Sequence, residues 1–388
     1  MYGMNTNNVK KTKYYSEKTE QGKRYIRILL VLFLSLFLLC SCESTEPVVL
    51  PTETVPIGTQ AGNLLGSNQN TATEQDEKLE VHFIDVGQGD AILIRFGEHA
   101  MQVDFGNNDK GTLVQSYLEK QGITSLDYAI GTHPDADHIG GMDVILYKWD
   151  VDTIFMPNKA SDTATYRDVL QVCKNKNYKI EVPKAGAEYS LGDASFQIIC
   201  PIADGYGDTN SYSIGIRLTY QDTSFVLCGD ATKESETEML CSNEPLSADV
   251  LKVSHHGSNT STSEEFLKAV NPSYAVISCG KDNSYGHPHQ ETMELLEQYQ
   301  VQIFRTDEQG SVVAVSDGKE IQWNTVEWSE DEPLSGYIYV LNTATKKYHY
   351  IWCSMVEDIK EENKEDTTKS KKELKKEGYE PCKRCVGE

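Results

Sequence analysis

The chain has 388 residues and is acidic, with 36 lysines and arginines against 59 aspartates and glutamates and a formal charge of −23. At roughly 100–200 residues per domain, this length allows two or three folded units. The composition is 39% apolar and 24% charged, which excludes wholesale disorder and a polytopic membrane protein. An acidic surface repels polyanions at long range and disfavours simple electrostatic wrapping of nucleic acid.

The first segment predicts export. Seven basic residues precede an apolar run from Ile28 to Leu39, which is too short to span a bilayer comfortably and is typical of a signal-peptide core. It ends in Leu39-Cys40-Ser41-Cys42, which resembles a bacterial lipoprotein box. The resemblance implies a signal peptide over 1–42, a lipid anchor on Cys42, and a position at the extracellular face of the cytoplasmic membrane. An uncleaved anchor or an ordinary cleaved signal would also place the remaining chain outside that membrane.

Residues 43–78 are rich in polar residues and proline without apolar periodicity, which predicts a flexible linker. From Leu79 on, apolar and branched residues predict strands near 81–83, 91–94, 101–105, 126–131, 194–200, 213–219, 223–228, 249–254, 274–278, 301–304 and 311–315. Helices are predicted near 113–118, 163–175, 232–241, 263–270 and 290–299. Clustered strands with helices between them predict a layered α/β fold over 79–324. An acidic stretch over 325–336 is a second predicted linker. Residues 337–388 form a small unit that hydrophobic burial alone would not stabilise, so we expect it to need a cross-link.

The histidines are unevenly distributed. Six of the nine lie in three short runs, each following a predicted strand: Thr132-His133-Pro134-Asp135-Ala136-Asp137-His138, Ser254-His255-His256-Gly257-Ser258 and Tyr285-Gly286-His287-Pro288-His289. Loops after strands are where an α/β scaffold presents its chemistry. Imidazoles and carboxylates that alternate over six residues can converge on one metal ion, so the pattern predicts a metal centre.

These runs, together with Phe83-Ile84-Asp85-Val86-Gly87-Gln88-Gly89-Asp90-Ala91 and Cys228-Gly229-Asp230-Ala231, resemble the metallo-β-lactamase superfamily. The subgroup is the hydrolase domain of ComEC-type competence proteins. The resemblance covers roughly residues 79–324 and implies an αββα sandwich with a metal centre at the end of its two sheets. The residues that match metal ligands are His133, Asp135, Asp137, His138, Asp230, one of His255 and His256, and one of His287 and His289. Asp104 matches a buried aspartate that braces the motif loop.

The sequence departs from most of the superfamily at two places, which both resemble the competence subgroup. Asp135 replaces a histidine, and Asn210, Ser211 and Ser213 lie near the position of an expected third histidine. Harder oxygen ligands shift the preference from Zn²⁺ toward Mn²⁺, so we expect two divalent ions, zinc or manganese. Two such ions would activate a water for attack on a phosphodiester, with Asp137 in the catalytic centre and His256 or His287 protonating the leaving oxygen. Asp85 or Asp90 supports the metal loop, with Asn210 close by.

The carboxy-terminal unit contains two ligand pairs, His349 with Cys353 and Cys382 with Cys385. This spacing predicts one structural zinc, and the unit is similar to the zinc-binding domain of Ada-type methylphosphotriester repair proteins, with His349 in place of a cysteine. A disulfide is the alternative. Nearby lysines offer phosphates a local basic face, or form a solvated helix of mixed charge.

We therefore expect an exported, lipid-anchored metallohydrolase of an α/β class, a phosphodiesterase or nuclease that acts on extracellular DNA. The alternatives are a hydrolase of another phosphoester of the cell envelope and a non-catalytic surface DNA-binding protein. The expected partners are DNA or another phosphodiester, the membrane through the lipid, and a DNA-uptake machinery.

Overall fold

The computed structural model describes residues 77–326, 339–383 and 385–386. The predicted signal peptide with Cys42, and most of both predicted linkers, lie outside this described part. None of the described helices is both long and apolar enough to cross a membrane.

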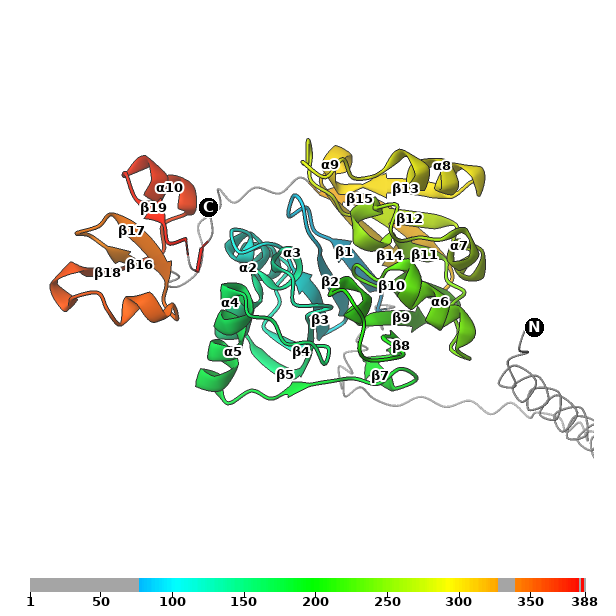
Figure 1. Cartoon of the computed structure of the whole chain (residues 1–388), viewed down its shortest axis with the longest axis horizontal. Coiled ribbons are helices and arrows are strands. Elements are labelled where there is room, and N and C mark those ends of the chain that lie inside the picture. The colour runs from blue at the N-terminus through cyan, green and yellow to red at the C-terminus, as the bar shows by residue number, and fades with distance from the viewer. Residues whose placement is uncertain (1–76, 327–338, 384, 387–388) are drawn as a thin grey trace, which may run out of the picture. The chain divides into compact units, whose positions relative to one another are not determined.

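The larger part of the described chain is built on two β-sheets (Figure 1). One sheet has eight strands in the order β15-β14-β1-β2-β3-β4-β5-β6. In that order they span Ile321–Val326, Ser311–Ser316, Leu79–Phe83, Ala91–Phe96, His99–Phe105, Ser125–Ile130, Asp150–Phe155 and Ile180–Glu181. The other has seven strands in the order β13-β12-β11-β10-β9-β8-β7. They span Gln302–Arg305, Tyr274–Ile277, Val250–Lys252, Thr223–Leu227, Gly215–Tyr220, Ala194–Cys200 and Glu188–Leu191.

Alternation along the strands explains why the sheets pack face to face. In β1, Leu79, Val81 and Phe83 point to the same side, because successive side chains of a strand alternate between faces. All three belong to one buried cluster that also contains Phe196 and Phe225 of the second sheet. The central core is therefore the apolar layer between the two sheets.

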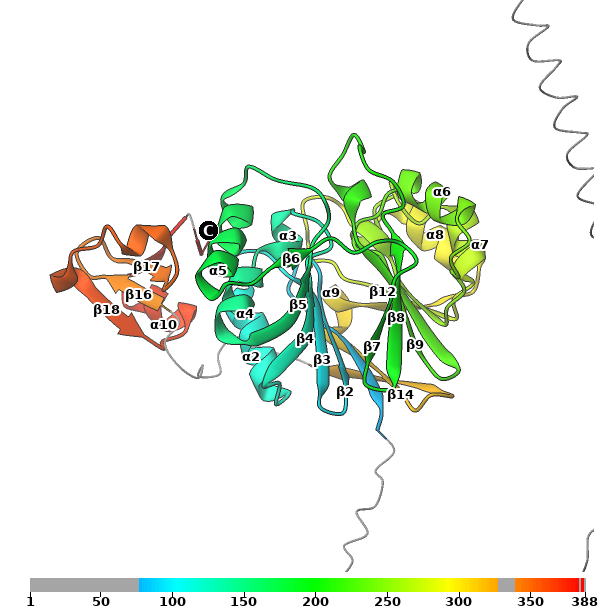
Figure 2. The same cartoon turned by 90° about the horizontal axis from the view of Figure 1, so that it is seen from below.

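Helices cover the outer face of each sheet, as Figure 2 shows. Helices α2 (Gly111–Lys120), α4 (Met142–Lys148) and α5 (Ala164–Lys176) lie on the eight-stranded sheet, and α6 (Lys233–Cys241), α7 (Glu264–Val270) and α8 (Gln290–Gln298) on the seven-stranded one. The loops between these elements contain four short helical turns: α3 (Ala136–Ile139), α9 (Thr306–Gln309) and the 3₁₀ turns η1 (Asn210–Tyr212) and η2 (Ser254–Gly257). This layering confirms the predicted αββα sandwich.

The elements that the sequence did not reveal are short or polar. Strand β5 reads Asp-Val-Asp-Thr-Ile-Phe, so its outward positions are polar and its apolar run is brief. Strand β7 (Glu188–Leu191) has four residues and helix α4 has seven. Elements this short contain too few helical turns or strand alternations for their apolar pattern to be distinguished from that of a loop.

The carboxy-terminal residues form a separate four-stranded sheet in the order β18-β16-β17-β19. These strands span Lys364–Thr367, Tyr339–Asn342, Lys347–Tyr350 and Glu380–Pro381, with helix α10 (Lys371–Lys376) and the turns η3 (Ser354–Val356) and η4 (Glu361–Asn363). Tyr350 stacks on Tyr339 and on Trp352, with ring centroids 5.3 and 4.8 Å apart. Stacked aromatic rings supply much of the apolar surface of so small a unit.

Trp352 also contacts helix α4 through a buried carboxylate. Its indole Nε1 donates a hydrogen bond of 2.5 Å to Oδ2 of Asp143 in α4. Asp143 is only 3% exposed, and burial raises its pKa to about 7. The folded protein thus keeps a proton that the unfolded chain releases near pH 4.

This difference predicts how stability depends on pH. Between about pH 4 and 7 the folded state retains the Asp143 proton while the unfolded state has lost it, so the free energy of unfolding falls as pH rises, by up to ~4 kcal/mol in total. Asp143→Asn keeps an acceptor for Trp352 and removes this contribution. Urea unfolding across that range should show a shallower pH dependence in Asp143→Asn, whereas the exposed-site control Asp152→Asn should follow the wild type. Parallel profiles for Asp143→Asn and the wild type would contradict the assignment.

Candidate metal centre

The candidate residues meet because neighbouring parallel strands end at the same edge. Strands β3 and β4 are parallel, and their ends lead to Asp104 and to the His133 run. Strands β10, β11 and β12 are also parallel, and the first two lead to Asp230 and to the His255–His256 pair. Each sheet thus presents its polar loops at the carboxyl ends of its parallel strands.

Asp104 holds the loop after β4 in place. Its carboxylate accepts hydrogen bonds from the backbone N and the Oγ1 of Thr132, both at 2.8 Å, and lies 2.7 Å from Nδ1 of His138. Asp104 has a φ of 55°, a conformation that costs a non-glycine residue of order 1–3 kcal/mol and persists only where the surroundings enforce it. Because Nδ1 of His138 donates to Asp104, it is Nε2 that faces the centre and, in the neutral ring, carries the lone pair.

A first group of possible ligands consists of His133, His138 and Asp230, whose ligand atoms lie within 4.8 Å of one another. Asp230 Oδ1 lies 3.2 Å from His138 Nε2. The half-exposed Asp135 borders this group, with its Oδ2 3.6 Å from His133 Nε2. Asp135 thus occupies a position from which it could add an oxygen ligand.

A second group consists of Asp137, His138 and His256, again within 4.8 Å of one another. His256 donates from Nδ1 to the carbonyl oxygen of Ser278 at 3.0 Å, which directs Nε2 toward Asp137 Oδ2, 3.3 Å away. The same Nε2 is 3.6 Å from Oδ2 of Asp230. The two oxygens of Asp230 therefore face two different histidines, His138 and His256, so this carboxylate could serve two ions.

The side chains themselves fit the divalent ions that the fold implies. His133 Nε2, His138 Nε2, His256 Nε2 and Asp230 Oδ1 are buried atoms that have no hydrogen-bond partner. A buried polar atom without a partner is costly, and the large majority are satisfied. Four such atoms that converge, all of them metal-ligand types, are explained by bound cations.

The charges of the two groups support the same interpretation. Burial by itself would raise the pKa of Asp230, but His138 and His256 hold it well below its usual range. Burial would likewise lower the pKa of His256, yet Asp230, Asp137 and Asp90 raise it to about 10. Without metal, protons on imidazole therefore balance the buried carboxylates, and binding of divalent ions should release protons.

A buried ion pair that the sequence did not predict lies next to Nδ1 of His256, the ring nitrogen that faces away from the candidate ligands. Lys252 is fully buried, and its Nζ lies 2.9 Å from Asp90 Oδ2 and donates to the carbonyl of Val253 at 2.9 Å. Oδ1 of Asp90 is 3.4 Å from Nδ1 of His256. The signal available in the sequence was a lysine inside the apolar run Val250-Leu251-Lys252-Val253, because an unpaired lysine is almost never fully buried.

Two glycines allow the loops of the site to approach one another. A Cβ on Gly89, which has a φ of 145°, would lie 2.4 Å from the carbonyl oxygen of Asp137. The backbone N of the next residue, Asp90, donates to that same oxygen at 3.1 Å. Gly229, with a φ of 51°, leaves no room for a side chain against Thr132. The turn Gly87-Gln88-Gly89 therefore packs against the loop that contains Asp137.

The remaining candidates lie around the two groups rather than in them. His255 has its Nε2 3.7 Å from Asp230 Oδ2 and 3.4 Å from Asn210 Nδ2. His287 is next to the site, with its ring centroid 6.2 Å from that of His256. His289 accepts a hydrogen bond from the backbone N of Asn259 and is the N-cap residue of α8. Asp85 accepts from the backbone N of Gly87 and so closes the turn, and the side chain directed to the site from this motif is that of Asp90.

The four predicted zinc ligands of the carboxy-terminal unit also converge. His349, Cys353, Cys382 and Cys385 are all buried, with ligand atoms within 4.8 Å of one another. Three sulfurs and one imidazole form a closed donor set of the kind that holds structural zinc. The cluster is compatible with the predicted zinc-binding unit. The other described cysteines, Cys173, Cys200, Cys228, Cys241 and Cys279, are unpaired, and only Cys241 is exposed.

Two kinds of metal site predict separable losses of metal. Asp230→Asn should deplete the ions held by the His133 and His256 groups, while Cys385→Ser should remove one equivalent of zinc and unfold the small sheet, whose burial alone is insufficient. Metal content per chain by mass spectrometry, together with near-ultraviolet circular dichroism, measures both. Cys241→Ser, at an exposed cysteine, is the matched control and should lose nothing. Loss of the same ions in Asp230→Asn and Cys385→Ser would show that the sites are not independent.

Comparisons with known proteins agree with this architecture. The profile of the Metallo-beta-lactamase superfamily matches residues 84–281. The chain is 33% identical over 253 residues to ComE operon protein 3 of Bacillus subtilis, covering 60% of this chain and 32% of the relative. It is 32% identical over 238 residues to Recombination protein 2 of Haemophilus influenzae, covering 60% of this chain and 28% of the relative. The chain thus spans about a third of the length of these curated relatives.

Among solved structures, the metallo-beta-lactamase fold protein YhfI of Bacillus subtilis covers 62% of this chain and 100% of its own, with 12% identity and a TM-score of 0.43. The family profile covers just over half of the chain and contains the His133, Asp230 and His256 loops. From the sequence match and the order of its motifs, the chain belongs to the metallo-β-lactamase superfamily and is related to competence proteins.

Proposed function

We propose that this chain is a metal-dependent phosphodiesterase that cleaves DNA outside the cytoplasmic membrane. The observation that carries the proposal is the overlap of two ligand groups, His133–His138–Asp230 and Asp137–His138–His256. When bound, two divalent ions supply a water of lowered pKa and positive charge for the oxygens of a phosphodiester. A site of this kind suits an acidic protein, because it holds phosphate without a broadly basic surface.

Two buried aspartates next to the ligand groups orient two of the candidate ligand histidines. Asp104 and Asp90 are both about 1% exposed, and they set the orientation of His138 and His256 through contacts with the Nδ1 atoms of the two rings. Asp230 presents one oxygen to His138 and the other to His256. Ligands that are oriented in this way lose little freedom when they bind an ion, and second-layer contacts of this type typically change metal affinity or activity by about 10–100-fold.

In this proposal we assign to His287 the proton transfer to the leaving oxygen, because it belongs to neither ligand group whereas His256 belongs to one. Burial and the neighbouring His256 and His255 lower the pKa of His287 to about 4, so its ring takes up the proton only when the negative charge of a bound substrate raises that pKa. Its ring is stacked by Tyr285 and flanked by His255, with centroids 5.6 and 5.7 Å away. A group next to the ions but not bound to them can exchange protons with the substrate.

Two further points support DNA as the substrate and an extracellular position. The relatives include ones named Recombination protein 2 and Competence protein ComA, the latter from Neisseria gonorrhoeae. The basic and apolar segment that ends at Cys42 supports export and lipid anchoring.

Cleavage assays on the purified full chain test the activity. With Mn²⁺ or Zn²⁺ added in turn, the wild type should cleave a labelled oligonucleotide and bis(p-nitrophenyl) phosphate. Asp230→Asn should lower both rates by about 10³-fold, because loss of one preorganised electrostatic group in an active site already costs about 10²–10³-fold. His287→Ala should lower kcat while leaving the metal content unchanged.

The exposed-site variant Asp152→Asn is the matched control for Asp230→Asn and should retain wild-type rates. Cleavage of the small diester but not of DNA would reject DNA as the substrate and favour another phosphodiester. Metal-dependent cleavage that survives in Asp230→Asn would reject the proposed centre.

Cell fractionation tests the anchor. If Cys42 carries the lipid, Cys42→Ala should move the chain from the membrane fraction to the soluble fraction or the medium, whereas Cys40→Ala should not. A chain that stays with the membrane in Cys42→Ala, or that resists protease added to intact cells from which the outer layers have been removed, would count against a lipid anchor outside the membrane.

A further inference from the structure

Tyr285 lies in the loop between β12 and α8 and presents an aromatic ring to solvent. Its side chain is 65% exposed, more than any other large apolar side chain in the described part of the chain, where Val182 follows at 52%. A single exposed apolar residue is ordinary on a protein surface. The position of this one is not ordinary, because the same loop carries His287 next to the metal centre.

One face of the Tyr285 ring packs on His287. The two rings are stacked, with centroids 5.6 Å apart and planes 22° from parallel, and the ring of His287 lies 6.2 Å from that of His256. Gly286 has a φ of 75°, although a Cβ at that position would meet nothing within 4 Å. The backbone turn that brings the two rings together, rather than a lack of space, therefore explains the glycine. The other face of the Tyr285 ring is open to solvent.

Hydrogen bonds order the loop that carries this ring. Oδ1 of Asn283 accepts hydrogen bonds from the backbone N of Tyr285 at 3.2 Å and from that of His287 at 3.0 Å. Its Nδ2 donates to the carbonyl oxygens of Gly280 at 2.9 Å and of His287 at 2.6 Å. A loop that is ordered before it binds loses little conformational freedom on binding, so Tyr285 is well suited to hold a ligand.

The same loop is joined to the turn that packs against the loop of Asp137. The backbone N of Gly280 donates to Oε1 of Gln88 at 3.1 Å, and a Cβ on Gly280 would lie 2.7 Å from the backbone N of Gln88. The next residue, Gly89, closely approaches the carbonyl oxygen of Asp137. A continuous set of contacts therefore places Tyr285 relative to a candidate metal ligand.

We infer that the open face of Tyr285 stacks on a nucleobase of the strand that the metal centre cleaves. Every base has a flat π-face, so aromatic side chains hold single strands by stacking without reading their sequence. Two ring contacts join Tyr285 to His256, so the stacked base belongs to a nucleotide next to the scissile phosphate. This role rests on the proposed function, because it takes DNA as the substrate. The strand must be single there, since neighbouring bases cover the faces of a base inside a duplex.

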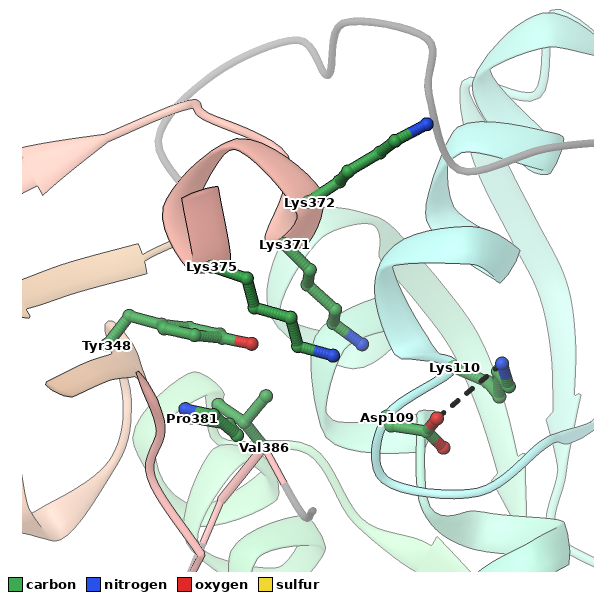
Figure 3. Close-up of a pocket in the computed structure, with 8 residues that line it drawn as sticks. All are labelled: Asp109, Lys110, Tyr348, Lys371, Lys372, Lys375, Pro381 and Val386. Atoms are coloured by element: carbon green, nitrogen blue, oxygen red, sulfur yellow. Dashed lines mark ion pairs between the residues drawn. The ribbon is translucent and has the colours of Figure 1, made fainter. Parts of the chain in front are cut away.

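The lysines of α10 are a competing candidate for a contact with the strand. Lys371, Lys372 and Lys375 line a cavity of about 310 Å³. Figure 3 shows the ammonium group of Lys372 pointing away from those of Lys371 and Lys375, and Lys371 is only 8% exposed. These three charges do not gather on one accessible face, whereas Tyr285 is accessible and lies beside the metal centre.

Cleavage kinetics on two matched strands test this role in the full-length chain. One substrate is an oligothymidylate of about 12 nucleotides, within the span of a single-strand binding site, and the other is the same sugar–phosphate strand with an abasic residue in place of each thymidine. Tyr285→Ala should lower kcat/KM for the oligothymidylate by about tenfold, chiefly through a raised KM, because it removes one stacked base. The value for the abasic strand should stay at that of the wild type.

Tyr285→Phe keeps the ring and should retain the wild-type preference for the strand with bases. Tyr147→Ala is the matched control and should leave both strands unaffected, because Tyr147 is also exposed and stacked, on the ring of Trp352, but lies on α4. An equal loss on both strands in Tyr285→Ala would overturn the stacking role and assign Tyr285 to the positioning of His287. A loss in Tyr285→Phe as large as that in Tyr285→Ala would also overturn it, in favour of the hydroxyl.

Binding keeps this result distinct from the proposed function. If the wild type cleaves neither strand with Mn²⁺ or Zn²⁺, the proposed function fails, and fluorescein-labelled forms of both strands then serve as binding probes, since no product forms. Tighter binding of the oligothymidylate than of the abasic strand, lost in Tyr285→Ala and kept in Tyr285→Phe, would leave the stacking site standing. Equal affinities of the wild type for the two strands would overturn it.

Discussion

Buried negative charge is the constraint on which the rest of the site depends. Asp90, Asp104 and Asp230 are each at most 3% exposed, and a carboxylate removed from water costs several kcal/mol unless a partner compensates it. Asp104 accepts hydrogen bonds from Thr132 and His138, and Asp90 forms an ion pair with Lys252. Asp230 lies next to the imidazoles of both His138 and His256. It is therefore the one of these three carboxylates that faces two candidate ligand histidines.

The ion pair that compensates the buried charge of Asp90 also joins the two sheets of the sandwich. Asp90 directly precedes β2 of the eight-stranded sheet, and Lys252 ends β11 of the seven-stranded sheet. Their ion pair crosses between the sheets next to His256. Breaking one partner of a buried pair costs about 3–5 kcal/mol, so the packing of the sheets and the position of a metal ligand are tied to one contact.

The proposed metal centre would let an acidic chain hold phosphate. Its positive charge would come from ions held by the His133 and His256 groups. Such a centre does not require a basic overall composition, because charges close to a ligand outweigh distant ones screened by salt.

The sequence by itself predicted a layered α/β fold from local periodicity and a metal centre from its clustered histidines. The order of its motifs resembled one superfamily, and that resemblance implied the αββα arrangement and the set of histidines and aspartates that converge. The sequence left open which of His255 and His256 is a ligand, and which of Asp85 and Asp90 supports the loop of the metal centre. Nearby residues in a loop differ only in the direction in which the folded backbone turns their side chains. Little in the sequence pointed to Lys252, whose role depends on a carboxylate 162 positions away in the chain. Only the tertiary structure decided these, because they are contacts between the two sheets.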